Sequence, residues 1–71
     1  MRYLVILEKG PTSVGAYVPD LPGCVVAAET RDQALALIRE AIEFHIEGLM
    51  QNGETVLPPS STGEIVDVHA A

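Results

Sequence analysis

Acidic side chains are the most numerous candidates for chemistry in this 71-residue chain, which has ten of them. A two-metal nuclease site needs several carboxylates that converge on one place. Glu8, Asp20 and Asp67 lie in or beside expected strands and would supply such a site. The central apolar segment 3–7 contains no carboxylate, however, and the helix glutamates fall mostly on a solvated face. We therefore interpret the acidic residues as surface and keep a metal-dependent nuclease as the weaker alternative.

The histidines and the cysteine do not form a recognisable reactive site. His45 falls on an apolar helical stripe and His69 lies near the C-terminus, so the two lack the spacing of metal ligands. Cys24 is the only cysteine, which excludes an internal disulfide, and it is expected to pack as a small buried hydrophobe. No nucleophile elbow, phosphate-binding glycine loop or dinucleotide fingerprint occurs. The sequence predicts no enzymatic activity, no cofactor and no metal.

Composition predicts one small folded domain over residues 1–71. Hydrophobic residues make up 48% and charged residues 20%, which is typical of globular proteins. No apolar run approaches the roughly 20 residues that span a bilayer, and no signal peptide is recognisable, so a cytoplasmic protein without membrane contact is expected. The net charge of -6 disfavours direct nucleic-acid binding and suits a basic partner, although acidity also serves solubility.

The elements that must position these residues begin with three short strands. Segments 2–8, 14–18 and 24–28 are rich in aliphatic or alternating residues, and turn residues separate them. Pro22 and Gly23 fit the two central positions of a type II turn, because proline fixes φ at the first and glycine accepts a positive φ at the second. The spacing predicts an antiparallel meander.

One helix and a last strand follow. Thr30 is expected to cap the N-terminus of the helix in a capping box with Gln33. The helix is expected to end at Asn52 and Gly53. Segment 64–69 alternates and is predicted to be a final strand. The helix stripe recurs at three- and four-residue spacing and comprises Ala34, Leu35, Ile38, Ala41, Ile42, His45, Ile46 and Leu49.

The predicted fold class is α+β, with the order β-β-β-α-β. A three-stranded antiparallel meander is joined by a parallel fourth strand, through a right-handed crossover, and the helix covers one face. In the first strand, Tyr3, Val5 and Leu7 point to one face, and Leu4 and Ile6 point to the other. Leaving a large aliphatic side chain exposed forgoes about 1.5–3 kcal/mol of burial. We therefore expect a homo-oligomer, a dimer or a tetramer, with these five residues as the candidate oligomer face.

The chain resembles the HicB antitoxin family over nearly its whole length. The specific part is Tyr17-Val18-Pro19-Asp20-Leu21-Pro22-Gly23-Cys24 followed by the threonine-capped helix, and the prolines before Ser60 add support. The resemblance implies a partial ribonuclease-H-like fold that lacks the nuclease carboxylates. It also implies a partner, because family members typically cover the catalytic surface of HicA, a small basic toxin that cleaves messenger RNA. Many members carry a C-terminal DNA-binding domain, and none is expected here because the sequence stops after its last strand.

The loop that links the second and third strands is the candidate partner-binding site. Two prolines lower the entropy lost when a loop is immobilised, and Asp20 offers an acceptor to a basic partner. A purely structural turn is the alternative, since proline and glycine set turn geometry whether or not anything binds. The candidate residues are Pro19, Asp20, Leu21, Pro22 and Gly23.

Three functions therefore remain open. The first is an antitoxin, or a protein derived from one, that binds and occludes a HicA-like toxin. The second is a stand-alone oligomeric scaffold or small-ligand module without a toxin partner. The third is the nuclease considered above.

Overall fold

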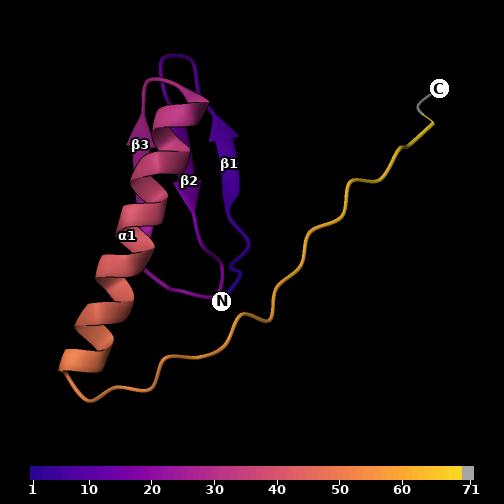
Figure 1. The fold of residues 1–71 in the computed structure, drawn as a ribbon. Coiled ribbons are helices and arrows are strands. Elements are labelled where there is room, and N and C mark those ends of the chain that lie inside the picture. Colours follow the sequence, from indigo (N-terminus) through magenta and orange to yellow (C-terminus); the bar gives the residue numbers. More distant parts are fainter. Residues whose placement is uncertain (70–71) are drawn as a thin grey trace.

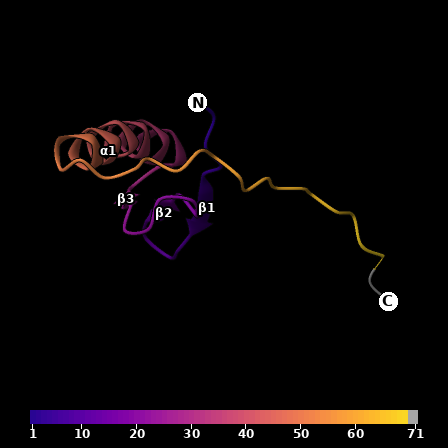
Figure 2. The ribbon, with the colours of Figure 1, turned by 90° about the horizontal axis from the view of Figure 1, so that it is seen from below.

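The computed structural model describes residues 1–69 and places three strands before one helix (Figure 1). Strands β1 (Ile6–Lys9), β2 (Val14–Tyr17) and β3 (Val25–Ala28) form an antiparallel sheet in the order β1-β2-β3. Helix α1 (Arg31–Gln51) packs on one face of the sheet, over β3 and β2 (Figure 2). The predicted meander, the α+β class and the single helix are confirmed.

Register explains how the core forms between sheet and helix. Ala16 of β2 lies opposite Leu7 on one side and Val26 on the other, so these three side chains share the face under α1. Ile38 of the helix packs there and is only 1% exposed. The buried core residues are Ala16, Val18, Leu21, Cys24, Ala34 and Ile38.

The strands are shorter than the sequence indicated. Pairing of β1 with β2 ends at Ile6 opposite Tyr17, because the chain then turns away at Val18 and Pro19. Residues 2–5 consequently have no neighbouring strand and are not part of β1. Tyr3 and Val5 nevertheless pack against the core.

The loop between β2 and β3 is a tight double turn. The amide of Leu21 donates to the carbonyl of Val18 over 3.1 Å, and the amide of Cys24 donates to the carbonyl of Leu21 over 3.1 Å. Gly23 has a φ of 86°, which is the conformation that the second central position of a type II turn requires. The predicted Pro22-Gly23 turn is confirmed.

Both helix ends follow the sequence signals. The Thr30 hydroxyl accepts from the amide of Gln33 over 3.2 Å, which is an N-cap. At the other end Gly53 has a φ of 71°, and the amide of Glu54 donates to the carbonyl of Leu49 over 2.8 Å, as in a Schellman motif. The helix has 21 residues and is therefore about 31 Å long, whereas strands of four residues span about 13 Å. Its C-terminal half therefore extends beyond the sheet.

The predicted fourth strand is not formed in the described part of the chain. Residues 64–69 are extended but pair with no strand, and they leave the body of the molecule (Figure 1). Ile65 is 95% exposed and Val66 and Val68 are exposed as well, so alternation alone did not bring this segment onto the sheet. A strand needs both a free edge and an apolar surface to cover, and the segment reaches neither within its own chain.

No helix within residues 1–69 has both the length and the apolar character needed to cross a bilayer.

Candidate partner-binding surface

The predicted loop divides into a buried part and an exposed part. Leu21 is buried in the core, and Asp20 is partly exposed. Pro19, Pro22 and Gly23 are exposed. The part of the loop that a partner can contact is therefore Pro19, Pro22 and Gly23, and the double turn of the loop holds these residues in place.

Asp20 binds the segment that follows the helix. Its Oδ2 accepts the amides of Ser60, over 2.9 Å, and Ser61, over 2.8 Å. Its Oδ1 accepts the hydroxyls of Ser60, over 3.2 Å, and Ser61, over 2.7 Å. These bonds, led by the amide and hydroxyl of Ser61, lower the pKa of Asp20 to about 2. The carboxylate that the sequence offered to a basic partner is therefore already engaged within the chain.

A second side chain, that of Tyr3, holds the same segment. The Tyr3 hydroxyl donates to the carbonyl of Leu57 over 2.9 Å. Together with the Asp20 bonds, it fixes residues 57–61, which we name the anchored segment, across the N-terminal residues and the loop. The chain is therefore irregular but held in place from Leu57 to Ser61.

A hollow of about 330 Å³ lies where the loop, the helix and this connection meet. Leu21 and Pro22 form one wall, and His45 and Leu49 of α1 form another. The apolar stripe predicted on the helix thus continues past the sheet and meets the loop. The full lining is Asp20, Leu21, Pro22, His45, Leu49, Thr55 and Leu57.

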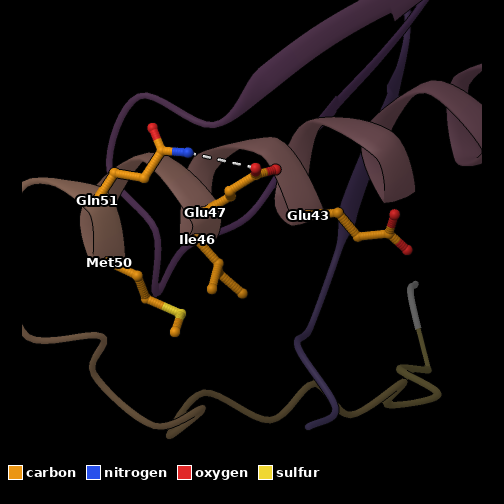
Figure 3. Close-up of a pocket in the computed structure, with 5 residues that line it drawn as sticks. All are labelled: Glu43, Ile46, Glu47, Met50 and Gln51. Carbon is orange, nitrogen blue, oxygen red and sulfur yellow. Dashed lines mark hydrogen bonds between the residues drawn. The ribbon is translucent and has the colours of Figure 1, made fainter.

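A larger open hollow of about 510 Å³ lies on the C-terminal half of α1; we name it the helix groove. Figure 3 shows Ile46 and Met50 pointing to the same side of the helix, with Glu43 at one end. Glu47 accepts a hydrogen bond from Gln51 over 3.4 Å. The groove therefore combines an apolar floor with two carboxylates and no basic lining residue.

The nearest basic group does not neutralise this groove. Arg39 Nε lies 3.9 Å from Glu43 Oε1, and both side chains are largely exposed. An exposed pair of this kind contributes little and is screened by salt. Phe44 lies one helical turn before Glu47 and is 79% exposed, although it does not line the groove. The arrangement suits a partner that presents apolar side chains flanked by positive charge.

The five residues of the candidate oligomer face separate onto two faces of the sheet. Tyr3, Val5 and Leu7 pack against the core, as the alternation predicted. Leu4 and Ile6 lie on the helix-free side and are partly exposed. Register places Tyr17 and Val25 beside Ile6 there, with Val25 65% exposed. The helix-free face is apolar at this row, and it is the part of the candidate set that remains open to another molecule.

The reactive residue types are dispersed. Cys24 is buried, and burial raises the pKa of its thiol, in agreement with the packing role inferred for it. Within residues 1–69 no group of three or more histidine, cysteine, aspartate or glutamate side chains is close enough to hold a metal ion. The nuclease alternative, which would have used Glu8, Asp20 and Asp67, gains no support from the described residues.

Sequence reasoning missed two parts of this surface. Asp20 and Ser60 are separated by 40 residues, and a polar pair so far apart leaves no periodic signal in one sequence. Met50 was outside the predicted stripe. It lines the helix groove because the C-terminal half of the helix extends beyond the sheet. The proline pair before Ser60 was the one available hint that the segment is ordered.

Three comparisons relate the chain to known proteins. A family model described as the HicB_like antitoxin of bacterial toxin-antitoxin system matches residues 3–70. The chain is 41% identical over 61 residues to a 14.9 kDa protein in the rep-hol intergenic region of Haemophilus phage HP1, with 86% of this chain and 45% of the phage protein covered. It is 40% identical over 73 residues to a UPF0150 protein of Thermoplasma acidophilum, with 99% and 100% covered.

A further relative carries a functional name. The chain is 31% identical over 72 residues to Antitoxin HicB 2 of Photorhabdus laumondii, with 100% of this chain and 52% of that protein covered. The chain therefore spans about half the length of the phage and Photorhabdus relatives and the full length of the Thermoplasma one. No solved structure matches it.

Proposed function

Because the chain belongs to the HicB-like antitoxin family, we propose that it binds a small basic HicA-type toxin and covers the surface with which the toxin cleaves messenger RNA. In this role the chain acts by association and carries out no reaction of its own. We place it in the cytoplasm, where a messenger-RNA-cleaving toxin would act.

The observation that carries this proposal is the chemistry of the helix groove. Its floor of Ile46 and Met50 offers apolar surface, and Glu43 and Glu47 lie beside it. An acidic rim attracts a basic partner and raises the association rate, and an apolar floor retains the partner once bound. The net charge of -6 acts in the same direction.

The loop contributes shape to the proposed contact. Pro19, Pro22 and Gly23 form a rigid exposed ridge, and the Asp20 bonds hold the anchored segment against it. A surface that is already ordered loses little entropy on binding. We propose that the ridge and the helix groove, which flank the C-terminal half of α1, face the toxin together.

The helix-free face favours self-association beside this function. Ile6, Tyr17 and Val25 lie in one row there, and no element within residues 1–69 covers them. We propose that the working form is a homo-oligomer. A fourth strand at the sheet edge would also complete the partial ribonuclease-H-like fold that the family resemblance implies.

Co-expression with a HicA-type toxin tests the proposed function. The tagged chain should retain the toxin through purification and rescue growth. Charge reversal at the groove, by Glu43→Lys with Glu47→Lys, should weaken toxin binding at least tenfold, with a steeper loss at low salt. The matched control, Glu8→Lys with Glu29→Lys, makes the same charge change on exposed residues away from the groove and should weaken binding much less.

Equal losses in the two double variants would show that net charge and not the groove determines binding. Absence of toxin from the purified complex, together with no rescue of growth, would refute the antitoxin role. Stabilisation by a small molecule in a thermal-shift screen, without toxin binding, would instead support a stand-alone scaffold or ligand module.

A further inference from the structure

Residues 64–69, which we name the extended tail, carry exposed apolar side chains that do not pack on the body. Ile65 is 95% exposed, Val66 is 71% exposed and Val68 is 79% exposed. The radius of gyration is 14.2 Å, against about 11 Å for a compact chain of this length. The excess reflects the tail, which runs away from the sheet in both views (Figures 1 and 2).

The exit direction of the tail is set by contacts just before it. The anchored segment is held at Ser60 and Ser61 by Asp20. At Gly63 an added Cβ would lie 3.3 Å from Leu4 Cδ1, so the chain passes closely beside the residues that precede β1. Beyond Gly63 every residue through His69 is exposed. The tail therefore starts at the sheet edge of its own chain and leads outward, where another molecule can receive it.

The β1 edge of the sheet can receive such a strand. β1 is an edge strand that pairs with β2 alone within residues 1–69, so its outer backbone edge is open. An open edge presents unpaired N–H and C=O groups that a further strand can bind. On the helix-free side Leu4 and Ile6 would meet alternate side chains of that strand.

Charge favours β1 over the other edge. Arg2 precedes β1, Lys9 is its last residue and Glu8 lies within it, which leaves one net positive charge along this edge, whereas Glu29 follows β3. The tail carries Glu64 and Asp67. An acidic strand is attracted to the edge flanked by positive charge and repelled by the edge that ends in a carboxylate.

We propose that the extended tail of one molecule adds to the β1 edge of a second copy of this chain, and that the two copies exchange tails about a twofold axis. Val66 and Val68 then lie on one face of the enlarged sheet, and Ile65 lies on the other. Each copy supplies the fourth strand that its partner lacks. The proposal concerns self-association and does not depend on the identity of any toxin.

Isotope-filtered NMR on a mixed sample tests the exchange directly. Half of the molecules carry ¹³C-labelled side chains and half are unlabelled, and the filter selects contacts between copies. We expect cross-peaks between the methyl groups of Val66 or Val68 and those of Leu4 or Ile6. Cross-peaks between these groups that appear only within one copy would overturn the proposal, because the tail would then close on its own β1.

Mass measurements on variants supply the second readout. The native chain should be a dimer by light scattering at micromolar concentration. Val66→Asp with Val68→Asp should weaken self-association at least tenfold while the helical circular dichroism stays unchanged, because the tail does not pack on the body. Leu37→Asp, a change to an exposed residue of α1 on the other side of the sheet from the helix-free face, is the control and should leave the dimer intact.

A monomeric native chain at all concentrations would refute the exchange. A dimer that survives both tail substitutions would also refute it, because the copies would then associate through another surface, such as the helix-free face or the β3 edge.

Discussion

The anchored segment and the extended tail are neighbours in sequence, and both lack regular structure, yet one is fixed and the other leaves the molecule (Figure 1). The anchored segment is held by hydrogen bonds to Asp20 and Tyr3. Its Pro58 and Pro59 have restricted φ angles and no N–H to satisfy, which lowers the cost of ordering it. The tail has the apolar alternation of a strand, but within residues 1–69 no strand pairs with it.

The difference shows that ordering depends on available partners and not on apolar content. Ser60 and Ser61 are polar, but each finds two acceptor contacts on one carboxylate. Ile65 is strongly apolar, but its own chain offers it no cover. Apolar alternation allows a segment to form a strand, but the strand forms only where a sheet edge is available to pair with it.

The largest expected effect separates the packed body from the tail. Ile38→Ala removes a side chain that is 1% exposed and should lower the free energy of unfolding by about 2–5 kcal/mol. Ile65→Ala, the same change in the tail, should alter it by less than about 0.5 kcal/mol in solutions dilute enough to keep the chain monomeric. Urea unfolding followed by far-ultraviolet circular dichroism measures both. A large loss for Ile65→Ala in dilute solution would contradict the separation, since it would mean that the tail packs on its own chain.

A smaller effect concerns the Asp20 contacts and their pH dependence. The pKa of Asp20 is lowered from 3.8 to about 2, so its ionised form is favoured in the folded chain. Its contribution to holding the segment is therefore fully present above pH 3.8 and is lost as the pH falls through about 2. In a proton-nitrogen NMR titration, the amide signals of Ser60 and Ser61 should shift with a midpoint near pH 2.

Asp20→Asn provides the matched control for this titration. The amide side chain has nearly the same shape, keeps one acceptor oxygen and does not ionise in this range. The transition of the Ser60 and Ser61 signals near pH 2 should disappear, and both amides should exchange with solvent faster. A transition that persists in Asp20→Asn would mean that another group controls the segment.

Local features of the fold could be predicted from the sequence. The Thr30 cap and the Asn52-Gly53 stop act through backbone groups within one turn, and the Pro22-Gly23 turn depends on two adjacent residues. Such signals need no knowledge of the rest of the chain. The meander and the buried helix stripe followed from periodicity for the same reason.

Features that depend on distant partners could not be predicted. The start of β1 at Ile6 depends on where β2 turns away, and the Asp20 contact joins residues 40 positions apart. The strand expected over 64–69 required a receiving edge, and alternation contains no information on which molecule provides that edge. For the candidate site, the prolines were enough to propose the loop. The helix groove could not be proposed, because it depends on how far the helix extends beyond the sheet.

The smallest expected effect tests whether the two anchors act together. Tyr3→Phe removes the hydrogen bond to the Leu57 carbonyl and should lower the free energy of unfolding by about 0.5 kcal/mol, the low end for one bond, because both groups are exposed. In an Asp20→Asn background the same change should cost less, because the segment is already partly released and the Tyr3 bond is made less often. Urea unfolding of the four proteins in this double-mutant cycle gives the coupling. An equal cost of Tyr3→Phe in both backgrounds would show that the anchors are independent, and the ordered state of residues 57–61 would then owe more to Pro58 and Pro59 than to cooperation between the two contacts.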